Sequence, residues 1–321
     1  MNAARYLQWV RPLFGLPRFG EARAKDPALA FFLSLPQRLE RAAGPGHFLE
    51  SSATTLRGLD VVKLALILKT PPDALARDAA RRDRPEKAET AARLLDALGS
   101  RRGGRYDKKR AEAVLEALGR WRLRGSLMVS CDFDRRALAF GKLSLYAYLP
   151  GPAQLPELLR PLGLEAHSRE VERLAGPTLG FFGLDLVPDG GATLKFYNRE
   201  RYSGQGLPEH VRAAAENLRE LTTVRDVTRL TRVGADVPAL QGGRAAPGPS
   251  PSVAGGDGRK VYLGFEEGVP LKEFGRVRCL SEHVDFFARL AHRAPGQRAY
   301  FLGFMGRELE VYFDDRSQGE A

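Results

Sequence analysis

Short strands arranged in pairs, with helix-forming segments between the pairs, constrain the fold of this chain more than any other feature. Period-two runs of apolar and polar residues give five pairs, or ten strands. The pairs occupy residues 48–56 with 61–69, 127–133 with 142–149, 179–187 with 192–199, 261–266 with 275–280, and 300–305 with 308–314. Connections this short force the two strands of a pair to run antiparallel. We therefore predict a large antiparallel sheet.

Helical periodicity, with apolar residues three and four apart, fills the stretches between the pairs. The predicted helices cover residues 28–43, 89–98, 107–121, 156–162, 208–230 and 282–292. Asp107 is suited to be the N-cap of the third of these helices. The third and fifth strand pairs also share a pattern of apolar strand, glycine turn and alternating strand, which favours a repeated strand–strand–helix unit.

One segment interrupts this regularity. Residues 234–258 hold eleven glycines and prolines in 25 residues, with no aromatic side chain. Such a composition cannot bury enough apolar surface to order itself, so we predict a flexible loop. Because the strand–helix pattern resumes after it, we place this loop inside a single domain of residues 28–315. A basic helical extension (1–27) and a short tail (316–321) flank that domain.

The strands alternate between an apolar and a polar face. The polar faces carry, strand by strand, Glu50 and Ser52; Lys63; Lys142, Ser144, Tyr146 and Tyr148; Thr193, Lys195, Tyr197 and Arg199; and Glu308, Glu310 and Tyr312. These faces either meet solvent, as in an open two-layer sheet, or line the lumen of a closed barrel. Tyrosines beside lysines suit a chamber, and an open sheet of ten strands exposes edges and tends to curl.

The net charge of +11 indicates an anionic partner: a nucleic acid, a membrane surface, or a phosphorylated or acidic substrate. Solvated surface arginines would explain part of the same charge. No apolar run approaches the ~18 residues that a membrane span needs, and no secretory signal is evident, so a cytoplasmic protein is expected. Cys131 and Cys279 are isolated, and the five histidines form no metal-binding pair, so no protein-held metal is predicted.

Several local segments, taken in order, resemble a known family. They are FLESSATTL, VVKLALILK, RLLDALGSRRGGRYDKKRAEAVLEAL, LSLYAYLP, LKFYNRE and LEVYF. Their order and spacing over residues 28–315 resemble the ABBA, or PT-barrel, aromatic prenyltransferases, most closely the cyanobactin-type peptide prenyltransferases. The resemblance implies an α/β fold in which a ten-stranded antiparallel β-barrel with a polar lumen is surrounded by helices, as five αββα repeats.

The resemblance also implies a function. A prenyltransferase of this type transfers a dimethylallyl or geranyl group from an allylic diphosphate to a side chain of a peptide natural product, with Mg²⁺ carried by the diphosphate. A small-molecule aromatic acceptor on the same barrel is the alternative. A further alternative is a non-catalytic basic module that binds RNA or a membrane surface. For the enzyme we expect a monomer that binds no nucleic acid.

By resemblance, each candidate site residue has a role. The expected diphosphate ligands are Lys63, Lys142, Lys195, Arg276 and Arg278. The expected carbocation shield is Tyr146, Tyr148, Tyr197 and Tyr312. Glu50 is the candidate general base, whereas Ser144 stands where relatives are often basic. The chemistry agrees with these residue types, because cations stabilise the leaving diphosphate, aromatic faces stabilise the allylic cation, and a carboxylate accepts the acceptor's proton.

Overall fold

The computed structural model describes most of the secondary structure of the chain. The described residues are 3–43, 47–68, 91–92, 108–120, 127–148, 155–162, 169, 172, 179–186, 192–201, 207–221, 228–237, 240–241, 244–245 and 260–314. Within these ranges, no helix combines the length and the apolar character that crossing a membrane requires. The predicted helix over residues 89–98 lies almost wholly outside them.

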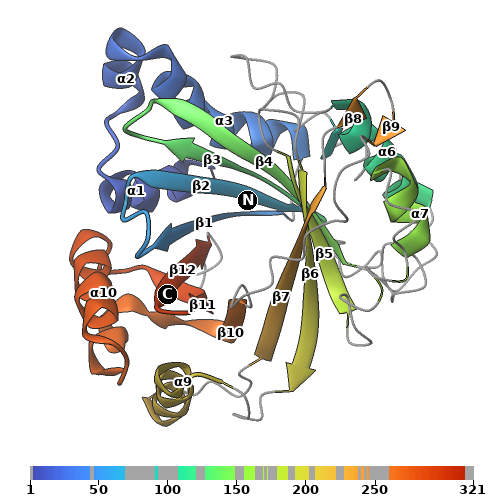
Figure 1. Ribbon diagram of the computed structural model, residues 1–321. Helices are drawn as coiled ribbons and strands as arrows, with labels where there is room; N and C mark the ends of the chain where they lie inside the picture. Colours follow the sequence, from blue (N-terminus) through green and yellow to red (C-terminus); the bar gives the residue numbers. More distant parts are fainter. Residues whose placement is uncertain are drawn as a thin grey trace, which may run out of the picture.

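A curled antiparallel sheet forms the centre of the molecule (Figure 1). Its strands are β1 (Phe48–Thr54), β2 (Val61–Leu68), β3 (Leu127–Asp134), β4 (Ala139–Tyr148), β5 (Leu179–Leu186), β6 (Ala192–Arg201), β7 (Thr228–Val237), β10 (Lys260–Pro270), β11 (Arg298–Met305) and β12 (Glu308–Asp314). They are hydrogen-bonded in the order β1-β12-β11-β10-β7-β6-β5-β4-β3-β2, and β1 also pairs with β2, which closes the ring. The predicted antiparallel sheet is confirmed. The short strands β8 (Leu240–Gln241) and β9 (Arg244–Ala245) pair separately.

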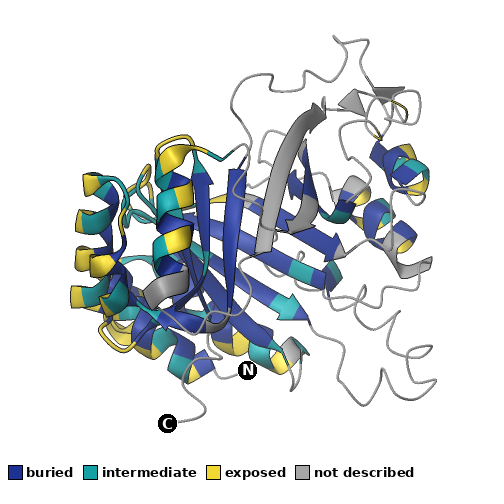
Figure 2. Cartoon of the chain, turned by 90° about the horizontal axis from the view of Figure 1, so that it is seen from below, coloured by how far each residue is buried: buried dark blue, intermediate teal, exposed yellow. Residues whose placement is uncertain are grey.

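Helices cover the outer face of this sheet (Figure 1). They are α1 (Ala3–Phe14), α2 (Phe19–Lys25), α3 (Pro27–Ala43), α6 (Lys108–Arg120), α7 (Leu155–Leu159), α9 (Glu209–Leu221) and α10 (Ser281–Arg293), with the 3₁₀ helices η3 (Arg160–Leu162) and η5 (Leu271–Arg276). Figure 2 shows that the coloured strands are mostly buried, while the helices expose their outward faces. In α10, for example, Phe286, Phe287 and Leu290 are buried, a spacing that puts them on one side of the helix.

Stacked aromatic rings fill the space between sheet and helices. The ring centroids of Phe32 on α3 and Phe133 on β3 are 4.8 Å apart, and Trp9 on α1 lies 5.9 Å from Phe313 on β12. These residues belong to one core cluster that runs from α1 to β12. The apolar face of each strand is therefore used for packing against helices, and the polar face is left to point inward.

The predicted helix over residues 208–230 is too long. Helix α9 ends at Leu221, and Thr228–Val237 forms β7, which pairs along β6 and with β10. The sequence from Thr228 is rich in β-branched residues, which favour strands, and a full-length partner strand is available in β6. For the same reason the predicted loop over 234–258 begins too early, because its first four residues complete β7.

The predicted strand over residues 275–280 is also wrong. Strand β10 continues to Pro270, and η5 follows it directly. Leu271, Phe274 and Val277 are buried at intervals of three residues, which is the period of a 3₁₀ helix rather than of a strand. Strand β10 pairs instead with β7 and β11.

Candidate active site

The interior of the barrel holds a cavity of about 580 Å³. Alternate residues of its strands line it, as the period of two requires. On β6, Lys195 and Tyr197 face the cavity while Leu194 and Phe196 are in the core outside the sheet. The predicted division of β1, β4, β6 and β12 into a polar inner face and an apolar outer face is confirmed for the described side chains.

Four tyrosines form a belt across the cavity: Tyr146, Tyr197, Tyr262 and Tyr312. Each is at most 7% exposed. Successive ring centroids lie 6.1 Å (Tyr146 to Tyr197), 5.9 Å (Tyr197 to Tyr262) and 5.8 Å (Tyr262 to Tyr312) apart. Phe181 stacks on Tyr197 at 4.0 Å and extends the belt. The belt presents a continuous set of π surfaces to whatever occupies the cavity.

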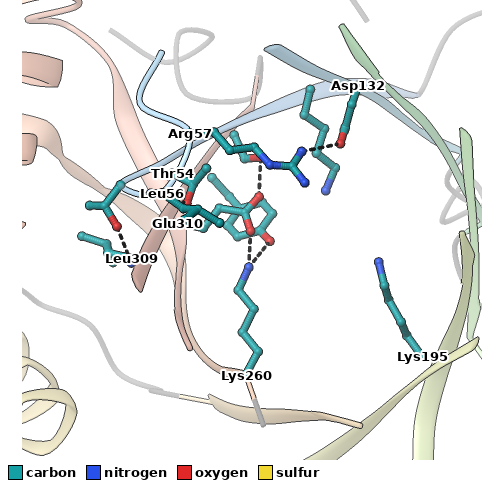
Figure 3. A network of polar contacts seen from close by, with 12 residues as sticks. Thr54, Leu56, Arg57, Asp132, Lys195, Lys260, Leu309 and Glu310 are labelled. Atoms are coloured by element: carbon teal, nitrogen blue, oxygen red, sulfur yellow. Dashed lines mark hydrogen bonds and ion pairs between the residues drawn. The ribbon is translucent and has the colours of Figure 1, made fainter. Parts of the chain in front are cut away.

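Three buried or half-buried lysines lie next to this belt. The ammonium nitrogen of Lys63 is 5.0 Å from the ring centroid of Tyr312, and that of Lys260 is 5.0 Å from the ring of Tyr262. Lys195 lies 5.8 Å from the ring of Tyr146. Because the lysines come from β2, β6 and β10, they approach the cavity from different sides. Figure 3 shows Lys195 and Lys260 extending toward the same open space.

Each cationic side chain in the cavity also contacts a carboxylate. Lys195 pairs with Asp185, and Lys260 pairs with Glu310. The nitrogen of Lys63 is 3.9 Å from a Glu50 oxygen, and Arg57 at the rim is 3.4 Å from Asp132 (Figure 3). The charged residues among the described lining are Arg57, Lys63, Lys195, Lys260, Glu50, Asp132, Asp185, Glu308 and Glu310.

The hydroxyl groups in the cavity fix the orientation of the carboxylates. Ser144 donates a 2.7 Å hydrogen bond to Asp185, and Ser52 donates a 2.5 Å bond to Glu310. Ser144, where the resemblance led us to expect a basic residue, thus contributes a hydrogen-bond donor to an acid. Lys260 in turn donates to the Tyr312 hydroxyl at 3.2 Å.

These contacts shift the acidities of the site. Burial alone would raise the pKa of Glu310, but the ammonium groups of Lys260 and Lys63 outweigh it, so the pKa is held well below its ordinary value. Burial raises the pKa of Tyr146, and the nearby Asp185 carboxylate raises it further. Burial and Glu310 raise the pKa of Tyr312 in the same way. Both tyrosines therefore remain protonated and can donate hydrogen bonds.

Two glycines make room for the inward-facing side chains. A Cβ atom on Gly183 would lie 2.5 Å from the ring of Tyr146. A Cβ atom on Gly303 would lie 2.5 Å from Cε and 3.2 Å from Nζ of Lys260. The absence of a side chain at these positions lets Tyr146 and Lys260 lie flat against the neighbouring strands.

The structure brings most of the predicted site residues together. Described residues from the prediction that line the cavity are Glu50, Lys63, Tyr146, Lys195, Tyr197 and Tyr312. Lys142 and Tyr148 lie on β4, but their side chains are outside the described part. Arg276 and Arg278 are exposed outside the barrel, since Arg276 ends η5 and contacts Glu273, and the Arg278 backbone binds Asn217. Their placement on an inner strand was wrong.

Sequence reasoning missed Lys260 and Tyr262 on β10, Asp185 on β5, Asp132 on β3 and Arg57 in the β1–β2 turn. The first two repeat the Lys-x-Tyr spacing of Lys195 and Tyr197, so the signal was present. The predicted strand began one residue after Lys260. Arg57 left no periodic signal, because it lies in a turn.

With this geometry in view, comparison with known proteins identifies the fold. No protein-family model and no curated protein matches the sequence. Solved structures do match over nearly the whole chain, among them dimethylallyltryptophan synthases, which are aromatic prenyltransferases of the ABBA type. The chain thus has the ABBA fold that the sequence segments suggested.

Three of the matches illustrate the similarity. The crystal structure of 5-dimethylallyltryptophan synthase from Streptomyces coelicolor has a TM-score of 0.57 and 13% identity, over 98% of this chain and 96% of that one. The same enzyme in complex with DMASPP and Trp gives 0.55 and 14%, over 98% and 93%. A 6-dimethylallyl tryptophan synthase gives 0.53 and 15%, over 94% of both chains. A particular closeness to cyanobactin-type enzymes is not among these findings.

Proposed function

We propose that this protein is a prenyltransferase that moves an isoprenoid group, dimethylallyl or geranyl, from an allylic diphosphate to an acceptor inside the barrel. One observation carries the proposal: three lysines converge on a buried belt of four tyrosines. A cationic site for an anion next to aromatic surfaces for a carbocation is the pair of features that this reaction needs. We also propose that five antiparallel pairs (β1–β2, β3–β4, β5–β6, β7–β10 and β11–β12), with their helices, are the five αββα repeats of one PT barrel.

In the proposed reaction, Lys63, Lys195 and Lys260 bind the diphosphate. The carbon–oxygen bond of the donor breaks, the diphosphate leaves with the electron pair, and the positive charge is spread over the allyl group. The lysines stabilise the leaving anion, and the tyrosine belt faces the cation and keeps water away. Lys142 and Tyr148 keep their roles only as predictions from the resemblance. Arg276 and Arg278 are exposed outside the cavity and have no part in the proposed reaction.

The new bond forms between the allyl carbon and the acceptor, which then loses a proton. Glu50 is the proposed base. It is buried on β1, faces the cavity beside the belt, and lies 3.9 Å from Lys63, which can hold the carboxylate in its charged form. A carboxylate that accepts this proton completes the transfer without any further reactant.

The acceptor is proposed to be either a peptide side chain or a small aromatic molecule. The peptide follows from the sequence resemblance alone. The small molecule fits the structural neighbours equally, since one of them is in complex with DMASPP and Trp. An exposed lysine–tyrosine sheet, which the RNA- or membrane-binding alternative requires, is not what the described strands present, because the tyrosines of the belt are buried inside.

Mg²⁺ is proposed to enter as a ligand of the diphosphate. Among the described residues, no three or more His, Cys, Asp or Glu side chains are grouped so that they could hold a metal ion by themselves. The ion would neutralise part of the charge of the diphosphate and make it a better leaving group.

Product mass tests the proposal directly. The purified protein would be mixed with dimethylallyl or geranyl diphosphate, Mg²⁺, and either tryptophan or short peptides that carry Tyr, Trp, His or Arg. A mass gain of one or two isoprene units that disappears in Glu50→Gln, while the variant still binds the donor, would support both the reaction and the base. If no acceptor gains mass and neither diphosphate raises the melting temperature, the proposed donor site does not exist.

A further inference from the structure

The lysines of the proposed donor site have anionic partners among the residues that line the cavity. Lys260 pairs with Glu310 and also donates to Tyr312, and Lys195 pairs with Asp185. Glu310 itself accepts a hydrogen bond from Ser52 at one carboxylate oxygen and from Lys260 at the other. A diphosphate that enters this site must therefore compete with carboxylates for the same ammonium groups.

The charge balance of the cavity makes this competition costly. Among the described lining residues, four are cationic and five carry carboxylates. A diphosphate adds about two or three further negative charges at neutral pH, into a space where the effective dielectric constant is low. Once Lys260 turns to the diphosphate, Glu310 keeps its bond from Ser52 and the attraction of the more distant Lys63, but it loses the one ammonium group that contacts it. A buried carboxylate without a cationic partner, next to a second anion, is strongly unfavourable.

We propose that Glu310 is the resident counter-ion of the diphosphate site: it pairs with Lys260 and, when a diphosphate takes Lys260, binds a cation that enters with the donor or the acceptor. The inference rests on the proposed function and adds a second ligand class to it. Two sources supply suitable chemistry, namely Mg²⁺ carried by the diphosphate, and an ammonium or guanidinium group of the acceptor.

The geometry around Lys260 supports an exchange of this kind. Gly303 leaves the lysine chain lying against β11, so its ammonium group is held within reach of Glu310 and Tyr312. Glu308, two residues before Glu310 on β12, also lines the cavity. Glu308 and Glu310 therefore both present a carboxylate to the cavity from the inner face of β12.

The same exchange explains how the product diphosphate can leave. Three buried lysines without counter-ions would hold a polyanion tightly, and release would then be slow. Because Glu310 takes Lys260 back, part of the binding free energy is returned when the diphosphate departs. Glu310 thus lowers the affinity of the site for diphosphate and so allows faster release of the product.

Calorimetric titration with inorganic diphosphate tests the inference without any acceptor. In metal-free buffer, Glu310→Gln should bind diphosphate about tenfold or more tightly than the wild type, because a charge-assisted contact to Lys260 is no longer lost. Glu21→Gln, at an exposed position of helix α2 outside the cavity, is the control, since it removes one negative charge without altering the cavity lining. It should change the affinity by less than about threefold.

Added cations separate the two sources. Methylguanidinium should tighten diphosphate binding to the wild type about tenfold, and this gain should vanish in Glu310→Gln if the acceptor supplies the cation. If Mg²⁺ tightens diphosphate binding to the wild type and this gain in affinity is smaller in Glu310→Gln, the metal is the cation that Glu310 binds. If folded Glu310→Gln binds diphosphate no better than the wild type, or if neither cation tightens wild-type binding, the inference is overturned. If diphosphate binds to no variant under any condition, the proposed function itself is wrong.

Discussion

Lysine 195 combines burial, an acidic partner and an aromatic neighbour in a single side chain. It is 6% exposed, pairs with Asp185 and lies 5.8 Å from the ring of Tyr146. An ammonium group in such surroundings costs much to bury, and an anionic ligand would recover much of that cost. Residues of this kind mark binding sites more reliably than exposed lysines do.

Lys195→Ala should weaken binding of dimethylallyl diphosphate about tenfold to a hundredfold, because a hydrogen bond to a charged group contributes about 1.5–3 kcal/mol. Calorimetric titration gives the affinity, and circular dichroism establishes that the variant is folded. Lys272→Ala, on the exposed face of η5, is the control and should bind like the wild type. Equal affinity in the two variants would remove Lys195 from the donor site.

Gly183→Ala should destabilise the protein by about 1–3 kcal/mol, since the new methyl group would lie 2.5 Å from the ring of Tyr146, and overpacking has a cost of this size. Urea unfolding measures the difference. Gly20→Ala serves as a control of opposite sign: it lies in helix α2 with open space around it, so alanine should stabilise by about 0.5–1 kcal/mol. A neutral Gly183→Ala would mean that the Tyr146 ring has other positions open to it.

At the scale of single elements, helix α10 and helix α9 both contact the turn that joins β11 and β12. His283 on α10 contacts the Arg307 carbonyl at 2.7 Å, and His210 on α9 contacts the Gly306 carbonyl at 3.0 Å. Arg307 also binds Glu282 at 2.6 Å. Gly306 has a φ of 58°, which suits a glycine in a two-residue hairpin turn. The turn that carries Glu308 into the cavity is thus held from outside.

His283 should make this region sensitive to acid. The Arg307 carbonyl can only accept a hydrogen bond, so Nε2 of His283 is the donor. The buried Nδ1 of His283 has no partner among the described residues. Burial lowers the pKa of His283 below its ordinary value of 6.5, so the folded state prefers the neutral ring. The stabilisation is then complete above pH 6.5 and is lost as the pH falls through the lowered pKa of the folded state.

Unfolding free energies between about pH 7.5 and about pH 5 check this expectation. The wild type should lose more stability on acidification than His283→Asn, whereas His292→Asn, an exposed position on the same helix, should keep the wild-type slope. The neighbours His210, Glu282 and Arg307 are unchanged in both variants, so their titration cancels in the comparison. Identical slopes would contradict the assignment to His283.

The elements that the sequence predicted well are those with a strong single period. The alternation of β6 identified both its faces, and α3 and α10 ended within two residues of their predicted limits. The predictions failed where a segment fits both the helical and the strand period. In the sequence, the three-residue apolar spacing of α9 continues toward β7 through Leu218, Leu221, Val224 and Val227. The sequence alone therefore extends the helix, and it is the pairing with β6 that makes residues 228–237 a strand.

The candidate site was predictable to a similar degree. Alternation placed Lys63, Lys195 and the tyrosines on an inner face, but it could not pair them with acids. Lys195 and Asp185 face each other within the β5–β6 hairpin, whereas Lys260 and Glu310 are 50 residues apart on β10 and β12. Both contacts depend on strand register, which alternation along one strand does not give.

At the scale of the whole molecule, the barrel depends on one junction. Strand β12 pairs with β11 on one side and with β1 on the other, with Ser52 opposite Tyr312 and Thr54 opposite Glu310. Leu309, Val311 and Phe313 on its outer face are completely buried. Without β12 two strand edges would be exposed and a part of the core would be lost.

A chain that ends at residue 307 should therefore lack a cooperative unfolding transition. A chain that ends at residue 315 keeps every described strand and should melt like the full-length protein. Differential scanning calorimetry compares the two. A cooperative transition in the shorter chain would show that the sheet is stable while open, and that closure is not needed for folding.

The junction between β1 and β12 also determines when, during biosynthesis, the sheet can close. Ser52 and Glu310, which meet across it, are 258 residues apart in the chain. While a ribosome is still translating the intervening residues, β1 has only β2 beside it, and its other edge is open to any nascent strand nearby. The cavity, with its charges and its tyrosines, comes into existence only when the last hairpin emerges. Until then the cell must keep an unfinished sheet, with one apolar face and two bare edges, from pairing with the wrong chain.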